Sequence, residues 1–382
     1  MSNRIEQLDS VRGLASLTVF FHHIYLVAAV PFVPFLFNYT PLRVLINGHA
    51  AVILFFVLSG FVLFLPFEKK NIFSYRKFTI RRILRIYFPY LVAISLAMFL
   101  ATLIPRGNTE NLSQWFNKSW NDPVSVQLVI EHISFVLNIH SGLYNNPIWS
   151  LIHEMRISLL FPIIALMVLR FNWKVNILIS LLLSAVSGLN DHFVFQKSNG
   201  YYTTYFDTLH FSSMFIFGAL IAKNRKFLVE LIRNRTLILK VGMLLSALVL
   251  YTFSDLIIYM AKLPVFFYER IVSDFIIMLG VCSILLISIA SSRIKSVLML
   301  KPIKFLGDIS FSLYLYHLII LLSFMHLFYG IIPVWTIILL CLISSLGVAT
   351  IAYYLVEVPF MKLGKNLTKF KRRANQFDNK AG

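Results

Sequence analysis

Two adjacent histidines, His22 and His23, lie in an apolar run that begins near Arg12. On a helix, Arg12 and His23 point within about 20° of each other and lie about 16 Å apart along the axis, whereas His22 is turned about 80° away. Arg12 would thus lie at one membrane surface and His23 near mid-membrane. A neutral imidazole can accept a hydroxyl proton near its own pKa. We predict that His23 is a general base and that Arg12 helps to hold the donor; the alternative is a histidine that hydrogen-bonds a neighbouring helix.

A basic cluster precedes a later apolar run, in RKFTIRRILRIYFPY (residues 76–90). Arg82 and Arg85 are three residues apart, so their guanidinium groups project from one side of a helix. The planar fork of an arginine matches the oxygen atoms of a phosphate. We predict that both bind a phosphate-bearing donor, while lipid headgroups are the alternative ligands.

Two further apolar runs carry polar side chains. In NPIWSLIHEMRISLLFP (146–162), Ser150 and Glu154 are four residues apart and would share one side of a helix, with Trp149 next to Ser150 in the sequence. A buried carboxylate needs a partner, which is either a substrate or an arginine of another helix. In KFLGDISFSLYLYHLII (304–320), the spacing of Ser310, Tyr314 and His317 predicts that they share one helical face. On that face His317 would be deep enough in the membrane to meet His23. We predict acceptor-binding or supporting roles for Trp149, Ser150, Glu154, Ser310, Tyr314 and His317.

The elements that position these residues are membrane helices. Hydrophobic residues make up 58% of the 382 positions and charged residues 13%, well away from a soluble composition. The formal charge of +19 comes from short basic runs between apolar stretches, which predicts cytoplasmic loops and contact with anionic lipid, not nucleic acid. Cys282 and Cys341 lie in apolar runs, so we predict neither a disulfide framework nor a metal site.

A spanning helix needs about 20 mostly apolar residues. By that measure the fold class is all-α, a polytopic membrane protein with about ten transmembrane helices. With the amino terminus inside, 28 of the 35 Lys and Arg residues fall in inner segments and 6 in outer segments, which predicts that both termini are cytoplasmic. The predicted spans are 11–30, 48–67, 83–104, 148–169, 175–190, 207–222, 237–259, 271–290, 309–328 and 334–356.

The remaining segments are connections. The stretch 127–139 is too short to span, so we predict an interfacial or re-entrant helix there. The outer loop 105–147 carries Trp115 and Trp120, which suit a membrane surface. Pro359 is expected to end the last helix. We therefore expect a membrane domain over 1–361 and a basic cytoplasmic tail over 362–382.

The sequence resembles the acyltransferase 3 family of bacterial membrane O-acyltransferases over residues 4–361. The resemblance rests on five motifs in order, and the family's Arg-x10-His and Arg-x-x-Arg patterns match Arg12 with His23 and Arg82 with Arg85. The motifs are RIEQLDSVRGLASLTVFFHH, FFVLSGFVL, RRILRIYFPY, WSLIHE and GDISFSLYLYHL.

The resemblance implies a multi-pass protein of the bacterial inner membrane. Its co-substrate would be cytoplasmic acyl-CoA, commonly acetyl-CoA, and its acceptor a hydroxyl of a cell-surface glycan or lipid-linked sugar, without metal or other cofactor. Many members carry a fused soluble domain, so an extracytoplasmic transfer step would need a partner transferase. The rival function is a transporter or flippase of a polysaccharide or lipid-linked sugar, because many spans with buried polar groups also suit transport.

Overall fold

The computed structural model describes residues 5–27, 37, 40–68, 73–104, 109–262 and 268–378, with side chains as far as residue 368. The chain is 82% helical, and the described residues contain no strand, which confirms the all-α fold class. The elements in chain order are α1 Glu6–Val27, η1 Pro41–Leu45, α3 Gly48–Phe64, η2 Leu65–Glu68, α4 Tyr75–Leu103, α5 Gln114–Lys118, α6 Val126–Ile133, α7 Ile148–Arg170, α8 Trp173–Phe193, α9 Tyr205–Arg233, α10 Leu237–Thr252, α11 Ser254–Met260, α12 Glu269–Ala290, α13 Ser292–Leu298, α14 Lys301–Phe328, α15 Val334–Ala352, the π-helical turn η4 Tyr353–Glu357 and α16 Val358–Asp378.

Eight of the described helices are long and apolar enough to cross a membrane, and α10 with α11 would make a ninth. That pair is bent by 86°, so the predicted span 237–259 is not one straight helix. Helix α1 has 22 residues and the length to cross, about 33 Å, but Arg12 and the two histidines lower its hydropathy. We call the end of the bundle at which α1 begins the inner end, following the charge-based prediction.

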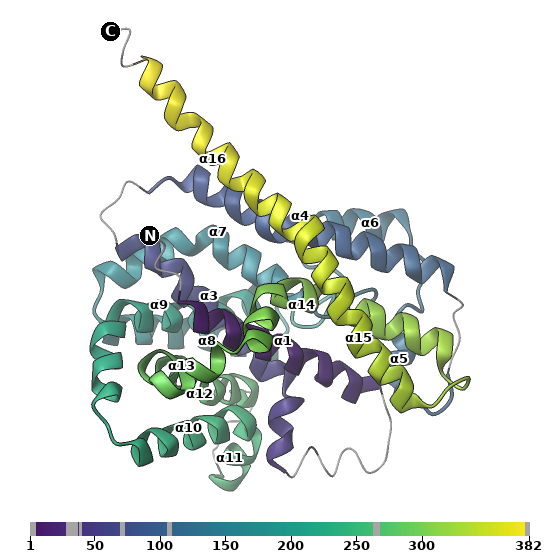
Figure 1. Cartoon of the computed structure of the whole chain (residues 1–382), viewed down its shortest axis with the longest axis horizontal. Helices are drawn as coiled ribbons and strands as arrows, with labels where there is room; N and C mark the ends of the chain where they lie inside the picture. The colour runs from purple at the N-terminus through teal and green to yellow at the C-terminus, as the bar shows by residue number, and fades with distance from the viewer. Residues whose placement is uncertain are drawn as a thin grey trace.

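The last helix does not stop where Pro359 predicted. The π-helical turn η4 leads directly into α16, so Pro359, the second residue of α16, lies just after a π-helical turn inside one continuous helical run. Helix α16 packs along α4, to which it is linked by Arg81 Nε donating to Thr368 Oγ1 at 2.8 Å, and extends beyond the bundle (Figure 1). The predicted boundary at 361–362 therefore falls inside a helix.

Helices α1 and α14 cross in close contact in the middle of the bundle (Figure 1). A Cβ atom added to Gly13 would lie 2.4 Å from the backbone nitrogen of Gly307, and one added to Gly307 would lie 2.6 Å from the carbonyl oxygen of Asp9. Side chains never approach backbone this closely, so only glycine permits the crossing. The crossing therefore sets the distance between the side chains on the facing sides of α1 and α14.

The segment between α4 and α7 covers the outer end of α1. It contains α6, which covers only the first part of the predicted short helix 127–139, and α5, whose Trp115 ring lies 5.6 Å from the His23 ring. Trp120 is not at the surface as predicted: it is buried, and its Nε1 donates to the carbonyl of Tyr144 at 2.8 Å. The loop is thus a packed cover over the histidines.

Candidate active site

His23 and His317 form a buried pair where α1 and α14 run side by side. His317 Nε2 lies 3.2 Å from His23 Nδ1, and both residues are almost fully buried. The predicted meeting of His317 with His23 is therefore confirmed. Two imidazoles this close cannot both be charged without strong repulsion, so the pair is neutral or shares one proton.

The hydrogen bonds determine where each ring carries its proton. His23 Nδ1 lies 2.8 Å from the carbonyl of Val19, and His317 Nδ1 lies 3.0 Å from the carbonyl of Leu313. A carbonyl can only accept, so both Nδ1 atoms carry hydrogen, and the Nε2 atom of each neutral ring holds a lone pair. His317 Nε2 turns its lone pair to His23. No described residue hydrogen-bonds His23 Nε2, which is left as a base.

The pair arises because α1 and α14 repeat one local pattern in parallel. Each histidine follows a crossing glycine by ten residues, about 15 Å along its helix. In each helix the serine three residues after the glycine donates to the glycine carbonyl, at 2.8 Å in α1 and 2.9 Å in α14. Because each histidine lies ten residues beyond the contact between the two glycines, the two imidazoles lie at the same height along the helices. The matched residues are Gly13, Ser16 and His23 in α1, and Gly307, Ser310 and His317 in α14.

Of the predicted supporting residues, Tyr314 and Ser150 meet each other. Tyr314 donates to the carbonyl of Pro147 at 2.8 Å, its oxygen lies 2.6 Å from Ser150 Oγ, and its ring lies 6.1 Å from that of His317. This contact ties α7 to α14 beside the histidine pair. Ser310 makes only its local helix bond, so it lies outside this group.

Arg82 and Glu154, predicted to serve the donor and the acceptor separately, are partners. Arg82 Nη2 lies 2.9 Å from Glu154 Oε1 and donates to Ser158 Oγ at 2.7 Å. Ser59 also donates to Glu154 Oε1, at 3.2 Å. The Arg82 and Glu154 side chains are only 10% and 19% exposed. The carboxylate neutralises a buried cation, which fixes α4 against α7.

Arg12 and Arg85 complete a charged group at the inner end of the bundle. Arg12 pairs with Asp9 at 3.2 Å, and the charges of Arg85, Glu154 and Glu357 all act on it. The carboxylate of Glu357 also accepts from Ser312 at 2.9 Å. Arg85 makes no hydrogen bond or ion pair with another described residue, so it is the guanidinium with open donors. Neither arginine contacts His23.

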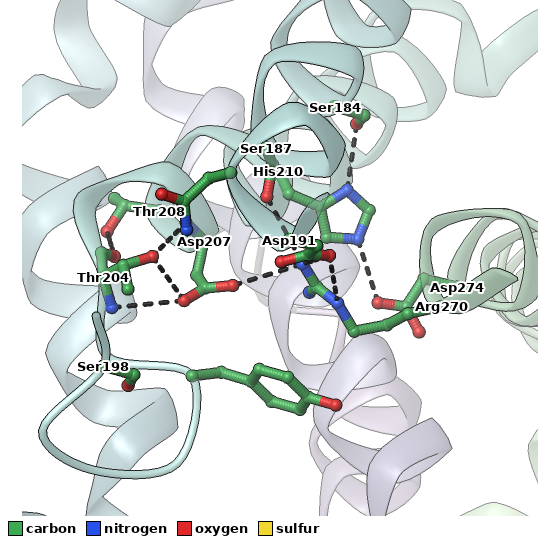
Figure 2. Close-up of polar contacts among 12 residues, drawn as sticks. Ser184, Ser187, Asp191, Ser198, Thr204, Asp207, Thr208, His210, Arg270 and Asp274 are labelled. Carbon is green, nitrogen blue, oxygen red and sulfur yellow. Dashed lines mark hydrogen bonds and ion pairs between the residues drawn. The ribbon is translucent and has the colours of Figure 1, made fainter. Parts of the chain in front are cut away.

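A second polar cluster joins α3, α8, α9 and α12, and the sequence did not predict it. Asp274 bridges two histidines: His49 Nε2 is 2.6 Å from Oδ1, and His210 Nε2 is 2.9 Å from Oδ2. Figure 2 shows His210 on Asp274 and, beside them, Arg270 on Asp191 and Asp207, at 2.7 Å and 3.2 Å. Trp149, a predicted site residue, lies parallel to His49 at 6.5 Å between centroids. A charged residue inside an apolar run, such as Asp274 in 271–290, was the available signal.

The inner end also carries a basic cavity of about 540 Å³, lined by the loops around α10 and α13. None of the predicted site residues lines it. No group of three or more His, Cys, Asp or Glu side chains within the described ranges is arranged to hold a metal ion. The basic lining residues are Arg233, Lys240, Arg293 and Lys295.

Comparison with known proteins gives a family match over most of the chain. The acyltransferase 3 family, described as an acyltransferase domain, matches residues 5–354. An uncharacterized protein of Haemophilus influenzae is 29% identical over 223 residues, which cover 52% of this chain and 86% of that protein. No solved structure matches.

Proposed function

Because the chain belongs to the acyltransferase 3 family and is a membrane acyltransferase, we propose that it transfers an acyl group from cytoplasmic acyl-CoA to a hydroxyl of a cell-surface glycan or lipid-linked sugar. The acyl group is proposed to be acetyl and the membrane the bacterial inner membrane. The observation that carries the proposal is the buried pair of His23 and His317, in which His23 Nε2 is left with a free lone pair.

The proposed reaction uses His23 as its base. His23 Nε2 removes the proton of the acceptor hydroxyl while the oxygen attacks the thioester carbonyl. The carbon–sulfur bond then breaks, and the leaving thiolate takes the proton from His23 to give free CoA. His317 supports this step because its Nε2 lone pair, facing His23 Nδ1–H, stabilises the imidazolium that forms.

The donor is proposed to bind through the arginines of the inner end. Arg85 has open donors for a CoA phosphate, and Arg82 lies one turn before it on the same helix. Glu154 holds Arg82 in place, so Arg82 adds charge from a fixed position. Arg12 brings a third guanidinium from α1. These three residues would hold the phosphate end while the thioester extends towards His23.

The test is acyl transfer from labelled acyl-CoA by the purified protein in nanodiscs, with isolated envelope glycans as acceptors. His23→Gln should abolish transfer and retain acyl-CoA binding. An Arg82→Gln/Arg85→Gln double variant should instead weaken acyl-CoA binding. Undiminished acyl-CoA binding by the double variant would show that neither arginine belongs to the donor site. The basic cavity lined by Lys240 and Arg293 would then be the next candidate for that site. A transporter would translocate a glycan without consuming acyl-CoA.

A further inference from the structure

The imidazole of His49 is held by a carboxylate and is partly open on its other side. His49 is the second residue of α3, and its side chain is 27% exposed, whereas that of Asp274 is 1% exposed. An ionised carboxylate can only accept, so Nε2 carries the hydrogen of the 2.6 Å contact. In the neutral ring the Nδ1 atom therefore holds a lone pair, and no described residue occupies it. In its neutral form this imidazole can accept a hydrogen bond at Nδ1.

The cluster behind His49 fixes this proton arrangement. The other Asp274 oxygen accepts from His210 Nε2 at 2.9 Å, and His210 Nδ1 lies 3.0 Å from the hydroxyl oxygen of Ser184. His210 is fully buried. Figure 2 shows both of its ring nitrogens in contact, one with Ser184 and the other with Asp274. Asp274 thus has a donor on each oxygen, and His49 cannot turn its ring over without losing one of them.

His49 lies near the histidine pair and not at a remote surface. A Cβ atom on its neighbour Gly48 would lie 2.6 Å from the ring of His22, which adjoins His23. On the other side, Trp149 lies parallel to His49, and the next residue, Ser150, contacts Tyr314 beside His317. His49 and His23 therefore flank one region at the outer ends of α1, α3 and α7.

The charges around His49 indicate what it can bind. Arg270 pairs with Asp191 and Asp207, and Arg156 also acts on Asp207, so two positive charges face three carboxylates when Asp274 is included. An anionic ligand would be repelled, whereas a neutral hydroxyl can donate to His49 Nδ1. The exposed ring of Tyr201, 5.3 Å from that of Trp149, adds an aromatic surface beside it.

We propose that His49, oriented by Asp274, is a binding residue of the acceptor site, where its Nδ1 accepts a hydrogen bond from a hydroxyl of a neutral sugar. The proposal rests on the proposed function, in which His23 removes the proton of the reacting hydroxyl. It adds a separate residue that holds the acceptor, and it excludes acceptors with a carboxylate next to the bound hydroxyl. Asp274 is a positioning residue that acts through His49.

The test compares binding of methyl glucoside, a neutral probe, with methyl glucuronide, its anionic counterpart, to the whole protein in nanodiscs without donor. His49→Gln retains an N–H group that can reach Asp274 but has no group at the Nδ1 position. We expect it to weaken methyl glucoside binding about tenfold and to leave acyl-CoA binding unchanged, as expected for one lost hydrogen bond. His192→Gln, on the exposed end of α8, is the matched control and should bind as the wild type does.

Asp274→Asn separates orientation from folding. The amide offers one donor and one acceptor, so one histidine must exchange its protonated nitrogen; for His49 this turns Nδ1 into a donor. Asp274→Asn should therefore weaken methyl glucoside binding by at most as much as His49→Gln does, and the double variant should bind no worse than His49→Gln. Additive losses, or His49→Gln binding as tightly as the wild type, would overturn the proposal, as would equal wild-type binding of the two probes. Wild-type protein that binds methyl glucoside but never acylates it or another glycan would instead overturn the proposed function.

Discussion

The glycine crossing of α1 and α14 makes a quantitative prediction for Gly307→Ala. The added Cβ would lie 2.6 Å from the carbonyl of Asp9, and ordinary contact begins at 3.4 Å, so the helices must separate by 0.8 Å at this point. If they move as rigid bodies, the 3.2 Å contact of His23 with His317 lengthens to about 4 Å and the hydrogen bond is lost. Overpacking of this kind costs about 1–3 kcal/mol of stability.

The same displacement should reduce activity, because a misplacement of about 1 Å in a reacting group can cost about 100-fold in rate. The assay is acyl transfer in nanodiscs, with the free energy of unfolding measured by denaturant in mixed micelles. Gly347→Ala is the control, since no atom lies within 4 Å of its added Cβ and alanine favours the helix by about 0.5–1 kcal/mol. If Gly307→Ala matches Gly347→Ala in both rate and stability, the crossing does not set the histidine distance.

Three further predictions concern contacts around the site. Tyr314→Phe removes the hydroxyl that contacts both the Pro147 carbonyl and Ser150, but Ser150 still donates to that carbonyl at 3.3 Å, so the change should cost about 0.5–1.5 kcal/mol. Ser310→Ala should cost less than about 0.5 kcal/mol, and chemical denaturation checks both variants. Glu154→Gln should cost about 1–3 kcal/mol by removing the charge partner of Arg82, and an equal cost in an Arg82→Gln background would refute the pairing. Burial lowers the pKa of His132, which bonds the Tyr90 hydroxyl, from 6.5 to about 4. Between these pH values only the unfolded state binds the proton, so the free energy of unfolding should fall by about 3 kcal/mol as the pH is lowered from 6.5 to 4. The fall should be smaller in His132→Gln. An equal dependence of the free energy of unfolding on pH in the two proteins would contradict this prediction.

The sequence predicted the parts of this molecule that follow from spacing along one helix. Eleven residues place Arg12 and His23 on one face of α1, and the stripe of Tyr314 and His317 brings the second histidine to the first. Apolar run lengths predicted most of the helices. The bend between α10 and α11 and the π-helical turn before Pro359 depend on packing between helices, which spacing within a single helix does not reveal.

Contacts between helices were harder to predict. Glu154 could have faced a substrate or an arginine, and only the packing of α4 on α7 selects Arg82. The bridge from His49 to His210 needs three helices that are far apart in the sequence. Asp274 was nevertheless visible as a charge within an apolar run, and the equal ten-residue spacing from glycine to histidine in α1 and α14 was also present in the sequence.

The most direct test of the central claim is a single-turnover measurement with labelled acyl-CoA, an accepting glycan and protein in nanodiscs. We predict that wild-type protein moves the label to the glycan and releases CoA. His23→Gln should bind acyl-CoA with wild-type affinity, keep its melting temperature and transfer no label. Transfer by folded His23→Gln at the wild-type rate would contradict the assignment of His23 as the base.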